Sequence, residues 1–308
     1  MTDNAIRLSG VTKAFAGHVA VKDLSLDVPR GSVFGLLGPN GAGKTTTLRM
    51  VMNVLGPDSG TIEILGSSAD HAVRDRIGYM PEERGLYPRM VLAEQLVFMA
   101  ELKGTSRRDA AARLPGWLER LGLAAWAGKK VNELSKGMQQ KAQFIATVLH
   151  QPDVLILDEP MSGLDPVGMD NMREILLDMR RQGTTLVLSS HQMETVERLC
   201  DRVALISRGE KILDGAVSDV KKQHGKNTLV LAFDGDGSFL ASFPGVAKVT
   251  DFGRYVEVKM NEGADPQPLL REAASRLRVS RFEIVEPSLH DIFVERVTGH
   301  GVVAVGGR

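Results

Sequence analysis

The 308-residue sequence predicts an α/β domain built around a mostly parallel sheet, followed by a small α+β domain. A glycine-rich loop links an apolar run to an amphipathic stretch near the N-terminus, and two later apolar runs end in polar residues. Continuous apolar runs of this kind are typical of buried parallel strands. The last quarter of the chain instead combines short strand-like runs with one helical stretch, which indicates a separate unit.

Each element of the first domain follows from a local pattern. Apolar and polar residues alternate in the first 28 residues, which predicts an antiparallel β region. A helix is expected from residue 45, ending at the Gly-Pro stop that begins at Gly56, and the stretch over 92–149 is expected to be largely helical. The expected strands span residues 5–15, 18–28, 32–38, 61–65, 154–160 and 184–191, with a hairpin over 203–215.

The domain boundary is expected where the composition becomes charged and polar, around residue 218. We expect a first domain over 1–218, a linker over 219–225, the α+β domain over 226–299 and a flexible tail over 300–308. In the α+β domain, Ser288 is expected to cap a short amphipathic helix.

Composition excludes several classes of protein. Hydrophobic residues make up 43% and charged residues 25%, as in soluble globular proteins. Lys+Arg and Asp+Glu are both 38, so the net charge of zero argues against binding nucleic acid through bulk charge. The single cysteine, Cys200, excludes a disulfide framework. No secretory signal and no long apolar run is present, so we expect any membrane role to require a partner.

The glycine-rich loop matches the phosphate-binding pattern G-x-x-x-x-G-K-[ST] between a strand and a helix. Its backbone N–H groups can face one anion, Lys44 supplies a positive charge for the β- and γ-phosphates, and the Thr45 hydroxyl suits Mg²⁺. The flanking strand and helix argue against a simple glycine-rich turn. The nucleotide-binding residues expected in this loop are Gly38, Pro39, Asn40, Gly41, Ala42, Gly43, Lys44, Thr45 and Thr46.

Acidic and histidine residues end the two later apolar strands. Asp158 and Glu159 follow one strand, where Asp158 is expected to hold Mg²⁺ and Glu159 to act as the general base for an attacking water. His191 ends the next strand and is expected to orient this water or contact the γ-phosphate. Because parallel strands meet the ligand at their carboxyl ends, we assign Glu159 and His191 to catalysis, together with Lys44, whose charge faces the β- and γ-phosphates.

The ordered motifs resemble those of the nucleotide-binding subunits of ABC transporters over roughly residues 5–218. Residues 134–140, LSKGMQQ, resemble the family's signature motif, and 162–166, SGLDP, resemble its D-loop. Phe15 stands at the position of the aromatic residue that stacks on adenine, and His191 at the position of the switch histidine. The resemblance implies an ATPase with ATP and Mg²⁺ as cofactors. It also implies a head-to-tail dimer in which Ser135, Gly137 and Asp165 act at the shared nucleotide sites.

The sequence departs from the family pattern at two places. The signature has Lys136 and Met138 where Gly and Gln are common, and we assign no catalytic role to Lys136. Glu82 stands where the family has a glutamine, and an ionised Glu only accepts hydrogen bonds. We still expect Glu82 to reach Mg²⁺ or water. By the resemblance, the segment 83–90 contacts a membrane subunit.

The resemblance also implies partners and a location. A permease in the membrane and a second ATP-binding subunit, identical or a sister chain, are expected, and nucleic acid is not. The chain would then be cytoplasmic and held at the cytoplasmic face of the inner membrane through the permease. The C-terminal unit resembles the accessory domain of bacterial export-type ATPases, which favours an exporter. Cargo contacts lie in the membrane subunits of such systems, so the sequence leaves the cargo unassigned.

The alternative functions conflict with features of the sequence. A soluble ABC-type ATPase acting on ribosomes or nucleic acid usually carries two cassettes or a long coiled coil, whereas this chain has one cassette and no sustained heptads. A kinase or GTPase with a phosphate-binding loop has no reason to carry the signature motif and D-loop.

Overall fold

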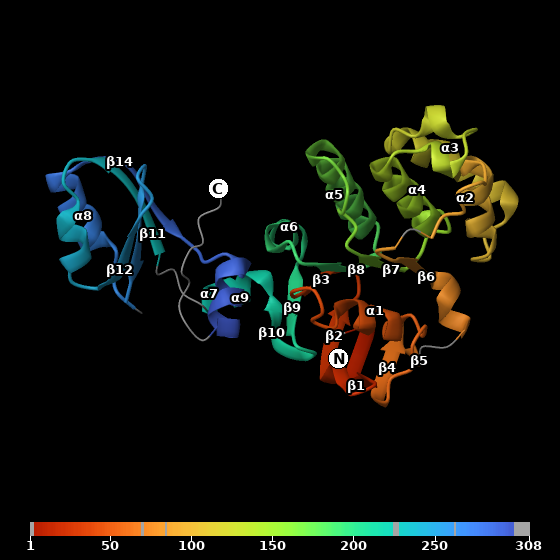
Figure 1. Ribbon diagram of the computed structural model, residues 1–308, viewed down its shortest axis with the longest axis horizontal. Coiled ribbons are helices and arrows are strands. Elements are labelled where there is room, and N and C mark those ends of the chain that lie inside the picture. Colours follow the sequence, from red (N-terminus) through yellow and green to blue (C-terminus); the bar gives the residue numbers. More distant parts are fainter. Residues whose placement is uncertain (1–2, 69–70, 84, 224–227, 262, 299–308) are drawn as a thin grey trace. The chain divides into compact units, whose positions relative to one another are not determined.

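The computed structural model describes residues 3–68, 71–83, 85–223, 228–261 and 263–298. The chain divides into two compact units between Gly215 and Ala216 (Figure 1). Where the sequence predicted a linker over 219–225, the structure has helix α7 (Val217–Gln223), which buries Val217 and Val220. The expected tail over 300–308 lies outside the described residues.

A six-stranded sheet forms the centre of the first unit, in the order β10-β9-β3-β8-β7-β6. The pairs β6–β7, β7–β8, β8–β3 and β3–β9 are parallel, so the carboxyl ends of these strands lie along one edge. Every residue of β3, β7 and β8 is buried, which explains their continuous apolar runs. The strands are β3 (Val33–Leu37), β6 (Ile77–Met80), β7 (Val154–Asp158), β8 (Thr185–Ser190), β9 (Arg202–Ser207) and β10 (Glu210–Ala216).

A second sheet of the first unit is antiparallel, as expected, in the order β2-β1-β4-β5. Its strands are β1 (Asn4–Phe15), β2 (His18–Pro29), β4 (Ser59–Ile64) and β5 (Ser67–Ser68). One buried apolar cluster joins this sheet to helix α1 (Lys44–Val51) and to the central sheet, with Leu24, Leu48 and Ile156 among its members. The antiparallel sheet therefore supports the strand–loop–helix unit that carries the phosphate-binding motif.

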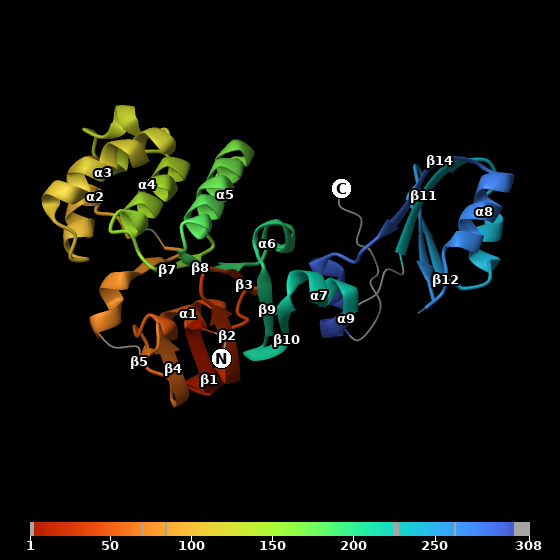
Figure 2. The same cartoon turned by 180° about the vertical axis from the view of Figure 1, so that it is seen from behind.

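Helices α2, α3 and α4 form a group of their own beyond the β6–β7 edge of the central sheet (Figures 1 and 2). This group is the helical subdomain that the sequence predicted. Helices α5 and α6 follow strands β7 and β8, respectively, along the chain. The bounds are α2 (Leu92–Glu101), α3 (Arg107–Arg120), α4 (Lys136–Val148), α5 (Pro166–Arg181) and α6 (Met193–Leu199), with short 3₁₀ helices at η1 (His71–Arg76), η2 (Ala124–Trp126) and η3 (Val131–Glu133).

The second unit is an α+β domain with a four-stranded antiparallel sheet in the order β12-β13-β11-β14. Helix α8 packs Leu269 and Ala273 against Leu229 and Val258 of the sheet in one buried cluster. Ser288 caps helix α9 as predicted, because its hydroxyl accepts a 3.1 Å hydrogen bond from the Asp291 backbone N–H. The bounds are β11 (Thr228–Asp234), η4 (Ser238–Ser242), β12 (Val246–Asp251), β13 (Val256–Met260), α8 (Gln267–Arg276), β14 (Arg278–Val285) and α9 (Leu289–Thr298).

None of the helices in the described part of the chain is both long and apolar enough to cross a membrane.

Candidate nucleotide-binding and hydrolysis site

The phosphate-binding loop connects β3 to α1 and packs closely against the surrounding backbone. A Cβ atom at Gly38 would lie 2.2 Å from the Ile206 carbonyl oxygen, and one at Gly43 would lie 2.4 Å from the Ala20 carbonyl oxygen. Gly43 also has φ +105°, which favours glycine. The glycines at these positions of the motif are thus required by close approach and by backbone conformation. The loop leads directly into the N-terminus of α1, and the backbone N–H groups at a helix N-terminus suit an anion.

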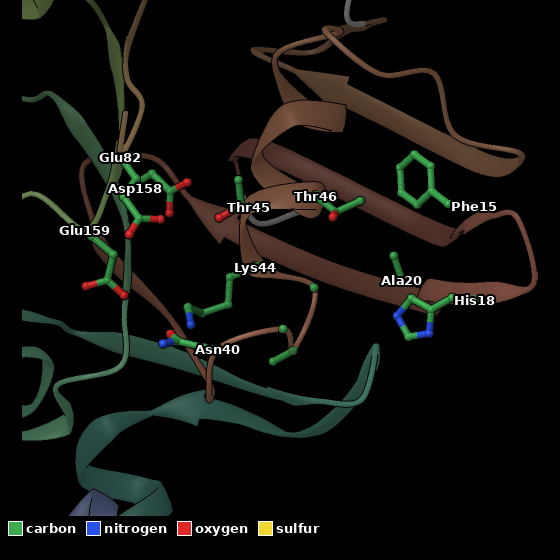
Figure 3. A pocket seen from close by; sticks show the side chains of 13 residues that line it. Phe15, His18, Ala20, Asn40, Lys44, Thr45, Thr46, Glu82, Asp158 and Glu159 are labelled. Carbon is green, nitrogen blue, oxygen red and sulfur yellow. The ribbon is translucent and has the colours of Figure 1, made fainter. Parts of the chain in front are cut away.

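This hollow has a volume of about 400 Å³, within the range of small-molecule sites. Figure 3 shows Phe15 at one end, on the β1–β2 hairpin, and the carboxylates of Glu82, Asp158 and Glu159 at the other. The residues that line it are Phe15, His18, Ala20, Asn40, Gly41, Ala42, Gly43, Lys44, Thr45, Thr46, Glu82, Asp158 and Glu159. The hollow is therefore acidic at the end formed by the three carboxylates and aromatic at the end formed by Phe15.

Lys44 extends along its own loop. Its Nζ donates hydrogen bonds to the carbonyl oxygens of Gly38 (2.7 Å) and Pro39 (3.2 Å). Burial lowers the pKa of the Lys44 ammonium, and the opposing effect comes from the carboxylates of Glu159, Asp158 and Glu82. The Lys44 ammonium is therefore buried, and two carbonyl oxygens hold it in the loop. A charged donor in this position can bind a phosphate in the hollow.

Asp158 ends β7 and is 1% exposed. The Ser189 hydroxyl of the neighbouring strand donates to its Oδ1, whereas its buried Oδ2 has no partner among the described residues. A buried carboxylate oxygen without a partner is unfavourable unless something binds it. Oxygen ligands are those that Mg²⁺ prefers, and Thr45 and Glu82 lie beside Asp158 (Figure 3). These residues fit a magnesium ion.

Glu159 is held between the ends of β7 and β8. Its backbone has φ +52°, an unusual conformation for a residue with a side chain. Its Oε1 accepts a 3.0 Å hydrogen bond from the His191 backbone N–H and lies 2.8 Å from His191 Nδ1, while the Ser190 hydroxyl lies 3.5 Å from its Oε2. The Glu159 side chain is 11% exposed and that of His191 is 50% exposed. The carboxylate is thus fixed in one orientation by a neighbouring strand end.

Not all predicted site residues lie around this hollow. Ser135 caps α4 by accepting from the Met138 N–H (3.3 Å), and Asp165 caps α5 by accepting from the Gly168 N–H (2.7 Å). A Cβ atom at Gly137 would lie 3.1 Å from the Gly163 carbonyl oxygen, so the signature turn packs on the D-loop of the same chain. Neither these three residues nor Gly38, Pro39 and His191 line the hollow.

His191 faces a second hollow of about 300 Å³ on the other side of Glu159. This hollow also contains residues of the D-loop, including Ser162 and Leu164. His191 therefore contacts the Glu159 carboxylate and lines a hollow together with residues of the D-loop.

Sequence reasoning missed His18 and Ala20, which line the nucleotide hollow beside Phe15. His18 pairs with Phe15 across the tight β1–β2 turn. The signal was the two-residue turn Ala16-Gly17, which places the residues on either side of it next to each other.

Comparison with known proteins agrees with this geometry. A sequence profile of the ABC transporter family matches residues 21–162, and one described as the C-terminal domain of DrrA1-3-like ATP-binding proteins matches residues 215–297. The uncharacterized ABC transporter ATP-binding protein YhaQ of Bacillus subtilis is 41% identical over 95% of this chain and 98% of its own length.

The names of two further relatives refer to a function. The linearmycin resistance ATP-binding protein LnrL of Bacillus subtilis is 33% identical, over 94% of this chain and 97% of the relative. The Nod factor export ATP-binding protein I of Burkholderia lata is 36% identical, over 96% of this chain and 97% of the relative.

Solved structures give the same result. One described as an ATP-binding subunit of an ABC transporter has a TM-score of 0.68 and 30% identity over 72% of this chain and 93% of its own. CbiO1 from Clostridium perfringens, part of the cbiONQ transporter complex, has a TM-score of 0.63 and 27% identity, over 71% of this chain and 90% of its own. With the phosphate-binding loop, the acidic strand ends and the helical subdomain, these matches establish that the chain is an ATPase belonging to the ATP-binding subunits of ABC transporters.

Proposed function

We propose that this chain powers an exporter by binding and hydrolysing ATP as one of two head-to-tail subunits on a membrane permease. Export is supported by two relatives, whose names refer to Nod factor export and linearmycin resistance. It is also supported by the C-terminal unit, which matches the DrrA1-3-like domain.

In the proposed reaction, Lys44 and the loop N–H groups hold the phosphates, and Phe15 contacts the base. Thr45, Asp158 and Glu82 would hold Mg²⁺, which supplies positive charge at the phosphate oxygens when bound. Glu159 accepts a proton from the water whose oxygen attacks the γ-phosphorus, and the bond to the ADP oxygen breaks. His191 keeps the Glu159 carboxylate in place through the 2.8 and 3.0 Å contacts.

The head-to-tail dimer is supported by the positions of the signature and D-loop residues. Ser135 and Asp165 are exposed and lie outside the hollow of their own chain. Both sit at helix N-termini, where backbone N–H groups attract anions. We propose that each signature completes the γ-phosphate site of the other subunit.

One observation supports the proposed contact with the permease. An exposed apolar hollow of about 590 Å³ lies next to the loop of Glu82. Tyr87 is 55% exposed and Phe98 is 39% exposed, and they line the hollow with Pro88, Arg89 and Met90. Contiguous exposed apolar surface of this kind marks a protein–protein contact. Four of its five lining residues, 87–90, belong to the segment 83–90, which the resemblance predicted to contact a membrane subunit. Through this contact the chain would sit at the cytoplasmic face of the inner membrane.

Co-purification from mild-detergent extracts of the native cells tests the proposal. We expect a stoichiometric polytopic membrane protein to accompany the tagged chain. Replacing Tyr87 and Phe98 with Ser should detach that protein while leaving ATP binding within twofold of wild type. Val54→Ser is the matched control, because Val54 is 63% exposed and does not line this hollow. Recovery of the chain with ribosomal proteins, or with no membrane protein, would contradict the transport function.

A further inference from the structure

Helix α4 carries two buried glutamines one turn apart that the reaction described above does not use. Gln140 is 3% exposed and Gln143 is 4% exposed, and the two are separated by three positions, so they lie on the same side of the helix. The N-terminus of the same helix carries the signature residues Ser135 and Gly137. The amides of both glutamines reach backbone atoms of the acidic loops at the nucleotide hollow.

The Gln143 amide spans the backbone around Glu82. Its Nε2 donates to the carbonyl oxygens of Pro81 (2.8 Å) and Glu83 (3.2 Å), the residues immediately before and after Glu82. Both acceptors are carbonyls, so the amide must present its nitrogen to them. Its Oε1 is buried without a partner among the described residues, so the hydrogen bonds found for this amide are those that its Nε2 donates.

The Gln140 amide makes the corresponding contact with the second acidic loop. Its Nε2 donates to the Pro160 carbonyl oxygen (3.2 Å) and lies 3.5 Å from the Glu159 carbonyl oxygen. One rigid helix therefore connects the signature motif to the loop of the metal-binding candidate and to the loop of the general base.

The backbone that Gln143 contacts belongs to an exposed segment. Glu82 and Glu83 are both exposed, and Pro81 has no N–H with which to anchor the segment to a neighbouring strand. Glu82 lines the nucleotide hollow beside Asp158 (Figure 3), so a small displacement of its backbone moves its carboxylate relative to Asp158. Removing a buried donor leaves two carbonyl oxygens without this partner, which favours a different loop conformation.

We propose that Gln143 is a positioning residue for ATP hydrolysis, which fixes Glu82 relative to Asp158 and ties that position to the signature helix. Gln140 does the same for the loop of Glu159. The inference rests on the role of Glu82 in the proposed function. Helix α4 would then have two roles: it presents the signature to the other subunit, and it positions the two acidic loops of its own chain.

A double-mutant cycle tests this proposal, using the full chain and measuring kcat, KM for ATP and the Mg²⁺ concentration that gives half the maximal rate. We expect Gln143→Leu to lower kcat about tenfold and to raise that Mg²⁺ concentration severalfold, with KM for ATP changed less than twofold. In a Glu82→Ala background the same change should lower kcat less than twofold, because the group that Gln143 positions is gone.

Thr147→Val is the matched control. Thr147 is buried one turn further along α4, and its hydroxyl donates 2.8 Å to the Gln143 carbonyl oxygen within the helix. It should lower the thermal midpoint without changing the Mg²⁺ dependence. Gln143→Met, closer in length to glutamine, serves as the second variant if the leucine variant does not fold.

Equal losses of kcat in the wild-type and Glu82→Ala backgrounds would overturn the proposal, as would an equal loss for Thr147→Val. If Glu82→Ala hydrolyses ATP at the wild-type rate, Glu82 has no role and the inference falls, while ATP hydrolysis and transport stand. Failure of the transport function would appear separately, as the lack of a permease in co-purification.

Discussion

The hydrolytic half of the proposed site, Asp158 and Glu159, is buried, whereas its signature half, Ser135 and Asp165, is exposed. Asp158 and Glu159 are 1% and 9% exposed, and hydrogen bonds from β8 and from the residue that follows it hold them in place. Ser135 and Asp165 are exposed, and the side chain of each accepts a hydrogen bond from the first turn of its own helix. The first half is preorganised inside one chain, whereas the second half is left open to a group from outside. This difference fits the site that we propose to be shared between two subunits.

The largest effect is expected where the buried half is changed. Glu159→Gln keeps the shape of the side chain but removes the proton acceptor, so kcat should fall about a thousandfold while ATP binding remains. An ATP-dependent dimer should then accumulate, which gel filtration with and without ATP will detect. Turnover within a few fold of wild type would show that Glu159 is not the base.

A smaller effect is expected in the exposed half. Ser135→Ala should lower kcat about a hundredfold by removing a γ-phosphate contact to the other subunit, while ATP binding to the single chain stays unchanged. It should also cost about 1 kcal/mol of stability as a lost helix cap.

Ser106→Ala is the control for the signature variant, because Ser106 caps α3 through a 3.1 Å bond from the Asp109 N–H and lies outside the nucleotide hollow. A similar loss of hydrolysis in both variants would mean that Ser135 is only a cap. Mixing Ser135→Ala chains with Glu159→Gln chains then tests the shared site. Each site of the proposed dimer combines Glu159 of one chain with Ser135 of the other. In a mixed dimer one site therefore carries both changes, while the other site has both native residues and should hydrolyse ATP.

The contrast between buried and exposed groups also separates two histidines. His191 is half exposed and contacts Glu159, whereas His150 is 9% exposed and neither of its ring nitrogens has a partner among the described residues. Burial is the main cause that lowers the pKa of His150 from 6.5 to about 4, and the charge of Lys103 adds to it, while the nearby Ile77 backbone and the Asp75 carboxylate oppose the shift. The folded chain therefore prefers the neutral ring.

This preference predicts a loss of stability in acid. The contribution of neutral His150 is fully present above pH 6.5 and falls as the pH decreases towards 4, because the unfolded chain takes up the proton first. The effect should be about 2 kcal/mol between pH 7 and pH 5. Urea unfolding of wild type and His150→Leu at both pH values measures it. An equal loss of stability in the two proteins would contradict the assignment to His150.

The smallest effects are expected at the adenine end of the hollow. Phe15→Ala should weaken ATP binding about tenfold, because stacking on the base is lost. His18→Ala should weaken it about threefold, because His18 lines the hollow beside Phe15 but is not the residue expected to stack on the base. Neither change should alter kcat at saturating ATP, since both residues lie far along the hollow from Glu159 (Figure 3). Fluorescence titration with a labelled ATP analogue measures both affinities. An unchanged affinity for both variants would mean that this end of the hollow does not hold the base.

Local patterns in the sequence explain most of what was predicted correctly. The loop between β3 and α1 was found because its glycines, lysine and threonine are adjacent in sequence, and the acidic and histidine strand ends were found because parallel strands share an edge. The helical subdomain and the antiparallel β region also follow from local periodicity. Helix α7 was missed because charged residues dominate its sequence, although Val217 and Val220 have helical spacing and are buried.

The sequence by itself determined the family, the nucleotide-binding loop and the order of the motifs, because each is a short run whose chemistry depends on neighbouring residues. Only the tertiary structure decided which distant groups meet. It places His191 against Glu159, leaves Asp158 Oδ2 without a partner among the residues that the structure describes, and brings the amides of Gln140 and Gln143 to the two acidic loops. These contacts join residues 19 to 62 positions apart. Sequence periodicity cannot report them, since packing across strands and helices sets them.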